Sequence, residues 1–119
     1  MGNTLVLGAS PDPYRYSYLA VQRLVEKGIP VFPIGIREGK IQGVDIIIGK
    51  PSLSDIHTVT IYLNVQNQKE YYDYIINLKP KRIIFNPGAE NIELMKIAQE
   101  AGIETKFECT LVLLSIGSY

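Results

Sequence analysis

The chain has 119 residues, of which 46% are hydrophobic and 20% charged, and its formal net charge is +0. This length predicts one domain over residues 1–119, with a core large enough to be stable without disulfide bonds or bound metal. The balanced charge disfavours non-specific nucleic-acid binding, and the single cysteine (Cys109) and single histidine (His57) disfavour disulfide frameworks and structural zinc. Because no apolar run approaches a membrane span and no targeting segment is recognisable, we expect a cytoplasmic protein without a membrane partner.

The first predicted element is a strand over residues 4–8. Its apolar run is continuous rather than alternating, which is typical of a strand covered on both faces. A loop over residues 9–16 follows, and Ser17 is a suitable N-cap for a helix. Gly28 stands where a helix commonly ends, so the first helix is predicted between these two residues.

The rest of the chain continues the alternation of strands and helices. Strands are predicted over residues 30–34, 58–63, 82–85 and 103–107, and helices over residues 67–78 and 90–101. Asn67 and Glu70 have the spacing of a capping box at the start of the second helix. The glycine-rich segment 35–57 predicts a short edge strand or hairpin, then one helical turn from Ser52. The apolar run 111–116 fits either type of element, and we favour a short buried helix.

This alternation predicts an α/β fold with three layers, in which a mostly parallel sheet of about five strands has helices on both faces. Ligands of such open α/β sheets bind beyond the carboxyl ends of the strands, where the strand order reverses. The loops that follow residues 7, 34, 63 and 85 are therefore the candidate binding loops, and all of them carry glycine or polar residues.

The first loop has the composition of a phosphate-binding turn. Gly8, Ala9 and Ser10 are small enough for a phosphate to approach the backbone, and the N-terminus of the next helix favours an anion. The Ser10 hydroxyl and the Arg15 guanidinium are further candidate ligands for the phosphate. The loop has one glycine where the dinucleotide-binding fingerprint has three. The alternative to a phosphate-binding role is a tight strand-to-helix turn with a solvated arginine.

The second and fourth loops bear on which nucleotide binds. Arg37 stands near the position where NAD-binding units present an acid, so a ribose phosphate is favoured, as in coenzyme A (CoA) or NADP. The alternative is an exposed loop charge. At the turn over residues 86–89, Asn86 is a candidate hydrogen-bond partner for a ligand, or it only ties together the turn at Gly88.

Three further features have competing interpretations. We expect His57 to be a surface histidine, since no acid or serine partner is evident. Cys109 is interpreted as a small buried hydrophobe, with exchange with a ligand thiol as the alternative. Tyr14, Tyr16 and Tyr18 have the chemistry to stack on an adenine, although packing beneath the loop explains them equally well.

The chain resembles the small CoA-binding domain proteins over essentially its whole length. Their Rossmann-like fold is shared with the CoA-binding domain of succinyl-CoA synthetase. The resemblance rests on Leu7-Gly8-Ala9-Ser10-x-x-Pro13-x-Arg15-x-Ser17, Val31-Phe32-Pro33-Ile34, Asn86-Pro87-Gly88-Ala89-Glu90 and Glu108-Cys109-Thr110-Leu111. It implies CoA binding through Ala9, Ser10, Arg15, Arg37 and Asn64.

We therefore predict a small module that binds CoA or an acyl-CoA, without catalysis of its own, because no loop offers a recognisable set of catalytic groups. An NADP-dependent oxidoreductase, or a regulatory or interaction domain without a ligand, are the alternatives. A small nucleotide is the expected partner, and a homodimer is possible. The candidate cofactor-binding residues are Gly8, Ala9, Ser10, Arg15, Arg37, Asn64, Asn86 and Gly88.

Overall fold

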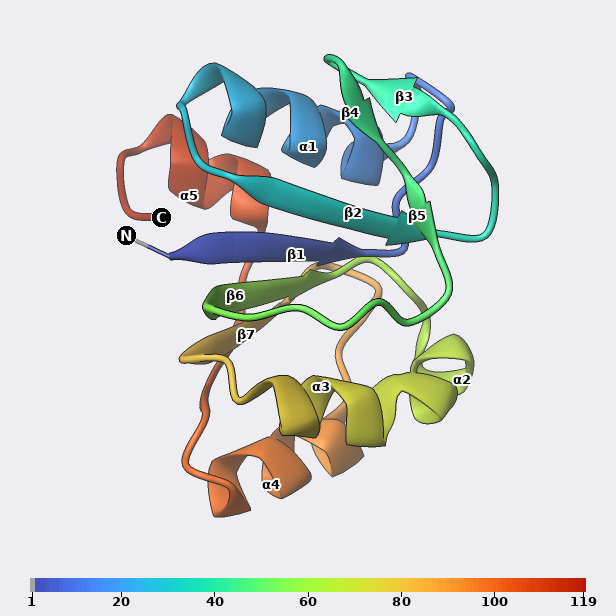
Figure 1. Cartoon of the computed structure of the whole chain (residues 1–119). Coiled ribbons are helices and arrows are strands. Elements are labelled where there is room, and N and C mark those ends of the chain that lie inside the picture. The colour runs from blue at the N-terminus through green and yellow to red at the C-terminus, as the bar shows by residue number, and fades with distance from the viewer. Residues whose placement is uncertain (1) are drawn as a thin grey trace.

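The computed structural model describes residues 2–119 and contains a six-stranded parallel sheet (Figure 1). Its strand order is β5-β2-β1-β6-β7-β8. The strands are β1 (Asn3–Leu7), β2 (Val31–Gly35), β5 (Ile47–Ile48), β6 (Ile56–Ile61), β7 (Arg82–Phe85) and β8 (Glu104–Phe107). The predicted α/β class is confirmed, and the sixth strand is the two-residue edge strand β5.

Helices cover both faces of the sheet, as Figure 1 shows. One face carries α1 (Tyr16–Glu26) and α5 (Thr110–Ser115), so the helical prediction for residues 111–116 is confirmed. The other face carries α3 (Tyr72–Leu78) and α4 (Ile92–Glu100), and the short α2 (Val65–Gln68) and the 3-10 turn η1 (Lys69–Tyr71) lead into α3. The strands β3 (Lys40–Ile41) and β4 (Val44–Asp45) form the hairpin expected within residues 35–57.

The central strand β1 explains the continuous apolar pattern of the first segment. Leu5 and Leu7 belong to the core cluster that also contains Leu94 of α4, whereas Val6 belongs to the cluster that contains Leu24 of α1. All three side chains of β1 are fully buried. Alternate residues of a strand point to opposite faces, so both faces of β1 must be apolar.

The strand order reverses at β1. The chain leaves β1 toward β2 and β5 on one side and then crosses to β6, β7 and β8 on the other. Two connections therefore diverge at the carboxyl ends of β1 and β6, which leaves an opening between the loops. The topology places the candidate binding loops around this reversal.

Two predicted helix starts and one predicted turn are wrong. α1 begins at Tyr16 with Arg15 as its N-cap, because Asp12 accepts a hydrogen bond from the Tyr14 N–H at 3.0 Å and turns the chain earlier than expected. α2 begins after Asn64, whose side chain accepts from the Asn67 N–H at 2.9 Å. Residues 51–55 form no helical turn. Gly28 does close α1, in a left-handed conformation with φ of 73°.

The third predicted strand is displaced toward the N-terminus. It was expected over residues 58–63, whereas β6 spans Ile56–Ile61. Tyr62 and Leu63 therefore leave the sheet and enter the loop at its carboxyl edge. As a consequence, their side chains line the cavity at that edge.

A buried polar cluster ties α5 to the sheet. The Asn86 side chain donates to Thr60 Oγ1 at 2.7 Å and to the Ile61 carbonyl at 2.9 Å, and it accepts from the Thr110 N–H at 2.8 Å. The hydroxyls of Thr60 and Thr110 are also 2.7 Å apart. Since buried polar groups need partners, this cluster specifies where α5 starts.

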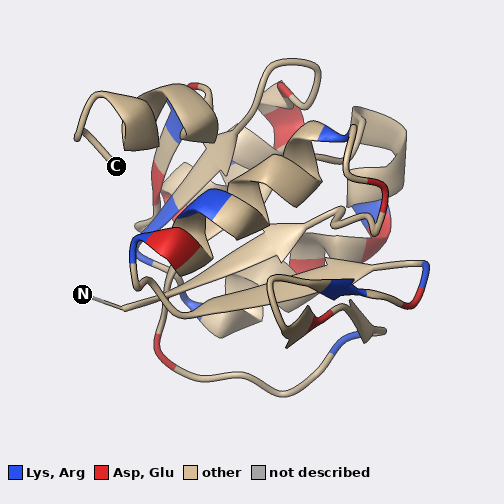
Figure 2. Ribbon diagram, turned by 90° about the horizontal axis from the view of Figure 1, so that it is seen from above, with Lys and Arg blue, Asp and Glu red and all other residues tan. Residues whose placement is uncertain are grey.

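In the view of Figure 2, Lys and Arg positions are interspersed with Asp and Glu positions along the ribbon. Among the described residues, no helix is long and apolar enough to cross a membrane.

Tyr119 holds the end of the chain against the sheet. Its hydroxyl is 2.6 Å from Thr4 Oγ1, and the Arg82 guanidinium carbon lies 4.4 Å from the centre of its ring. Arg82 is itself buried and donates to Thr58 Oγ1 at 2.7 Å. The tyrosine therefore supplies one hydrogen bond and one cation–π contact.

We expect Tyr119→Ala to lower the free energy of unfolding by about 2 kcal/mol, because both contacts are lost. Tyr119→Phe keeps the ring and should cost about 1 kcal/mol. Tyr14→Ala is the matched control, since Tyr14 is 93% exposed. Urea unfolding followed by circular dichroism measures all three, and equal stability of Tyr119→Ala and Tyr14→Ala would show that the contacts contribute nothing.

Candidate nucleotide-binding site

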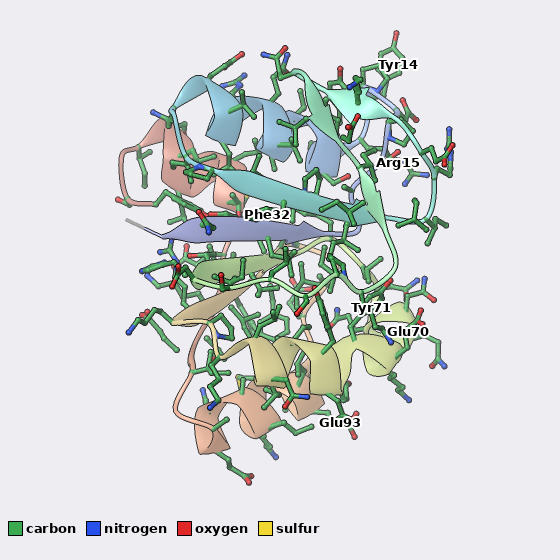
Figure 3. All side chains as sticks on the ribbon, viewed as in Figure 1. Tyr14, Arg15, Phe32, Glu70, Tyr71 and Glu93 are labelled. Atoms are coloured by element: carbon green, nitrogen blue, oxygen red, sulfur yellow. The ribbon has the colours of Figure 1, made fainter. Side chains whose placement is uncertain are left out.

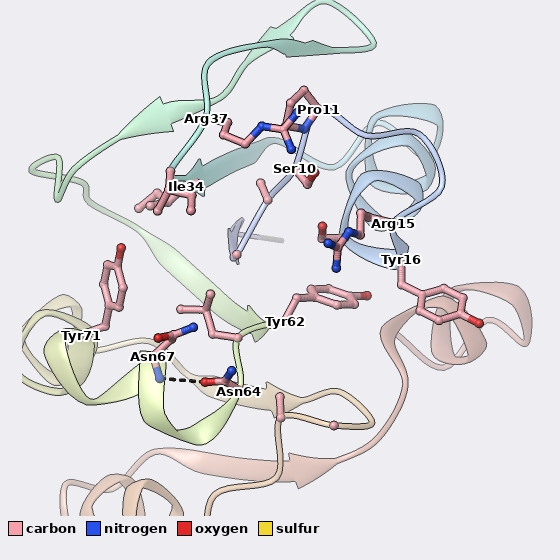
Figure 4. Close-up of a pocket in the computed structure, with 18 of the residues that line it drawn as sticks. Ser10, Pro11, Arg15, Tyr16, Ile34, Arg37, Tyr62, Asn64, Asn67 and Tyr71 are labelled. Atoms are coloured by element: carbon pink, nitrogen blue, oxygen red, sulfur yellow. Dashed lines mark hydrogen bonds between the residues drawn. The ribbon is translucent and has the colours of Figure 1, made fainter.

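A cavity of about 660 Å³ lies at the carboxyl edge of the sheet (Figure 4). All four predicted loops contribute to its lining. The lining residues are 8–11, 15–17, 34–37, 62–64 and 87–89, together with Asn67, Glu70 and Tyr71. The loops thus meet at the place where the strand order reverses.

The first loop is shaped by Gly8 and by one shared acceptor. Gly8 has a φ of 96°, a conformation that L side chains rarely adopt. The N–H groups of Gly8 and Ala9 both donate to the Ile34 carbonyl, at 2.9 and 2.8 Å. These two amides are consequently occupied by the protein. Their role in the site is to bend the loop.

Other amides of the same loop have no partner within residues 2–119. Ser10 and the first two residues of α1, Tyr16 and Ser17, donate no backbone hydrogen bond to the described chain. Unpaired N–H groups at the start of a helix attract anions. The amides available to an anion are therefore different from those at the glycine.

Gly35 allows the second strand to touch this loop. A Cβ built on Gly35 would lie 2.3 Å from the Ala9 carbonyl oxygen, a distance that real contacts do not reach. Any side chain there would push the first loop away from the sheet. Sequence reasoning placed no requirement on Gly35, because nothing local indicates this contact.

Two arginines come to the cavity from different loops, as Figure 4 shows. The Arg15 side chain is 72% exposed, and its one ion-pair contact, with Asp12, is long at 3.9 Å. Arg37 is exposed and forms no salt bridge with the described part of the chain. Both guanidinium groups are thus available to a ligand. A planar guanidinium suits a phosphate because it donates two parallel hydrogen bonds.

Polar and aromatic residues of the β6–α3 region form the opposite wall. Asn64 and Asn67 line the cavity, and Figure 3 shows Glu70 and Tyr71 on the same side of the molecule as Arg15. Lys50 donates to the Glu70 carbonyl at 2.8 Å, and its ammonium lies 5.2 Å from the centre of the Tyr71 ring. Burial raises the pKa of Tyr71, so its phenol is neutral near pH 7.

Gln68 fixes the distance between two of the binding loops. It is fully buried, and its side-chain amide donates to the carbonyls of Leu63 and Ala89, both at 2.8 Å. Its oxygen accepts from Asn91 Nδ2 at 2.9 Å. The third and fourth loops are therefore held together by one side chain, which sequence reasoning did not single out.

Seven of the eight predicted residues line the cavity, and Asn86 does not. Asn86 is 1% exposed, and its side chain is engaged within the buried cluster described above. These contacts support the alternative interpretation, in which it ties the turn together. Gly88 lines the cavity, but its N–H already donates to Glu90 Oε1 at 2.9 Å.

The structure adds Ser17 and Tyr62 to the lining. Ser17, expected as a helix cap, lies in the first turn of α1 and is 4% exposed. The Tyr62 hydroxyl is buried and has no hydrogen-bond partner among the described residues. Burial is the main reason that the pKa of Tyr62 lies well above its usual range, so the phenol is neutral and can donate.

His57 takes no part in this cavity. It is the second residue of β6, at the amino end of the strand, and its Nδ1 is 2.8 Å from Thr58 Oγ1. Burial, assisted by the nearby Arg82, lowers the pKa of His57. Residues 2–119 contain no cluster of three His, Cys, Asp or Glu side chains that could hold a metal ion.

The strand order, with its cavity at the reversal, defines a Rossmann-like α/β domain. The chain belongs to the CoA-binding domain family, whose model matches residues 2–115. The resemblance found in the sequence motifs is thereby confirmed. No curated protein matches the chain.

Several solved structures are similar. One is the crystal structure of an uncharacterized protein that is 50% identical, with a TM-score of 0.96 over 100% of this chain and 98% of that one. A protein from Thermus thermophilus is 20% identical, with a TM-score of 0.83 over 99% and 91% of the two chains. A hypothetical protein from Pyrococcus horikoshii OT3 is 26% identical, with a TM-score of 0.80 over 93% and 80%.

We expect Gly35→Ala to disrupt the site, because the new Cβ would collide with the Ala9 carbonyl. The free energy of unfolding should fall by about 2 kcal/mol or more, as for other overpacked positions. Gly49→Ala is the control. It meets no neighbour within 4 Å and bears only the strain of its φ of 95°, which should cost about 1 kcal/mol. Thermal and urea unfolding measure both variants, and equal losses would contradict the collision.

Removing the Asn86 amide should destabilise the fold. We expect Asn86→Ala to cost about 3 kcal/mol, because it leaves the Thr110 N–H and the Ile61 carbonyl without this partner in a buried place. Asn67→Ala changes an exposed side chain and should stay within about 0.5 kcal/mol of the parent. Urea unfolding of the two variants provides the comparison. A small loss for Asn86→Ala would mean that the buried cluster does not hold the turn.

Proposed function

We propose that this protein binds coenzyme A or an acyl-CoA in the cavity at the carboxyl edge of its sheet. The observation that carries the proposal is the meeting of Arg15, Arg37 and unpaired loop amides around one cavity of a CoA-binding family member. CoA has a diphosphate and a separate ribose phosphate. A site with two cations on different loops matches such a ligand.

The diphosphate would lie at the first loop. The free amides of Ser10, Tyr16 and Ser17 donate to it, and the start of α1 adds its positive dipole end. Arg15 stands beside the same amides. Gly8 and Ala9 contribute by being small, since their own amides are engaged with Ile34.

The ribose phosphate would lie near Arg37, at the end of β2. The pantetheine arm contains amides and hydroxyls, and it would follow the wall that carries Asn64, whose side-chain NH₂ has no partner among residues 2–119. From there it would continue along Gly88. This order of contacts uses seven of the eight predicted residues and leaves Asn86 as part of the scaffold.

A binding role without catalysis fits the lining better than an enzyme does. Glu70 is the one carboxylate among the lining residues of the described chain, and no histidine or cysteine accompanies it there. An NADP-dependent oxidoreductase remains the second candidate, because Arg37 equally suits a 2′-phosphate. The proposed partner is a small nucleotide, and a homodimer stays a prediction that light scattering can test.

Titration calorimetry with CoA, dephospho-CoA, NADP and NAD tests the proposal. CoA should bind with the highest affinity, and dephospho-CoA should bind more weakly because it lacks the ribose phosphate. Tightest binding of NADP would favour the oxidoreductase instead. No heat and no thermal stabilisation with any of the four at millimolar concentration would refute nucleotide binding.

Arg37→Ala should weaken CoA binding about tenfold, the loss of one charge-assisted hydrogen bond. The affinity for dephospho-CoA should hardly change, since the group that Arg37 contacts is absent from it. Arg23→Ala is the matched control, because Arg23 is an exposed residue of α1 that faces Glu26 rather than the cavity. Equal affinities of parent and Arg37→Ala for CoA would show that the ribose phosphate lies elsewhere.

A further inference from the structure

A second hollow of about 310 Å³ lies beyond the fourth binding loop. Four of its lining side chains are apolar: Phe85, Pro87, Phe107 and Val112. Phe85 and Phe107 pack edge to face, with ring centres 5.3 Å apart and planes at 87°. The hollow is therefore a small apolar depression between β7, β8 and α5.

The hollow exposes apolar groups that the fold leaves uncovered. Phe107 is 45% exposed and Val112 is 52% exposed, and both line the hollow. Exposed apolar side chains gathered around a depression are typical of ligand sites. The occupant must be largely apolar where it touches them.

The hollow adjoins the cavity of the proposed nucleotide site. Pro87 lines both spaces, and the next residue, Gly88, lines the larger cavity. β8 lies three strands from β1 in the sheet order, which at the usual spacing between strands is about 14 Å. An extended pantetheine arm is long enough to cross that distance when its diphosphate lies at the first loop.

The hollow also contains the one thiol of the chain. Cys109 is half-buried, lines the hollow, and immediately precedes α5.

Charge at the hollow restricts what it can hold. Glu90 and Glu108 line it, and no lysine or arginine accompanies them among its lining residues. Glu90 is held in place by the hydrogen bond from the Gly88 N–H. Two carboxylates with no cation between them repel an anion, so a carboxylate or a phosphate would bind poorly here.

We infer that this hollow receives the thiol end of bound CoA together with a short, uncharged acyl group carried on it. The inference rests on the proposed function, since it needs the diphosphate at the first loop. The inference specifies the class of ligand, which is a CoA thioester of a short, uncharged acyl group rather than of a dicarboxylic acid. It also places the sulfur of free CoA within reach of Cys109 Sγ.

Acyl specificity is the first test. Calorimetry should show that butyryl-CoA binds about tenfold more tightly than succinyl-CoA, which carries a carboxylate toward Glu108. Glu108→Gln should narrow this ratio by improving the binding of succinyl-CoA. Val112→Trp fills the hollow from an exposed position and should weaken the binding of butyryl-CoA. The affinity for 3′-phospho-ADP, which lacks the pantetheine arm, should equal that of the parent.

Disulfide trapping is the second test. The Cys109 thiolate attacks one sulfur of CoA disulfide, a protein–CoA disulfide forms, and one CoA thiolate leaves, so no other oxidant is needed. Mass spectrometry should show this adduct forming at least about tenfold faster than the adduct with glutathione disulfide at equal concentration. Excess 3′-phospho-ADP should slow it, and Cys109→Ser should abolish it.

The outcomes separate the inference from the function on which it rests. If neither CoA nor 3′-phospho-ADP binds, the proposed function itself is wrong. If both bind, but CoA disulfide reacts no faster than glutathione disulfide, the arm does not reach the hollow and the inference is wrong. Equal affinities for butyryl-CoA and succinyl-CoA would likewise overturn the assignment of an uncharged acyl group.

Discussion

The candidate site depends on the close approach of two strand ends. The Ile34 carbonyl accepts from both Gly8 and Ala9, and Gly35 lets the Ala9 carbonyl come nearer than any side chain would permit. These contacts bend the first loop sharply enough that the next free amides, at Ser10 and at the start of α1, are left for a ligand. The glycines thus act indirectly, by setting the course of the backbone, and the first free amide of the candidate anion site lies two residues after Gly8.

A second set of buried contacts positions the remaining loops. Gln68 joins the third loop to the fourth, and Asn86 joins the fourth loop to the start of α5. Each of these side chains is buried and has its amide hydrogens engaged by the protein. Such saturated polar groups are costly to misplace, so they specify one arrangement of the loops. The larger cavity and the hollow beside Cys109 therefore share one rigid boundary.

The sequence predicted the strands and the loops that line the cavity because their signals are local. Continuous apolar runs mark the buried strands, and glycine or polar residues follow each one. Ser17 was misassigned as a cap because Asp12 turns the chain first. Tyr62 was assigned to a strand over residues 58–63, but the strand in fact ends at Ile61. The role of Asn86 depends on Thr110, 24 residues away, and no local pattern reveals such a partner.

Charged side chains are distributed unevenly along the carboxyl edge of the sheet. Arg15 and Arg37 lie at the end formed by β1 and β2, whereas Glu90 and Glu108 lie at the end formed by β7 and β8. The chain as a whole is neutral, so this separation is local. A ligand with all its phosphates at one end and an uncharged arm at the other matches that gradient. CoA has this asymmetry, whereas NADP has its diphosphate between two nucleosides. The same charge distribution would therefore favour the proposed ligand CoA over NADP.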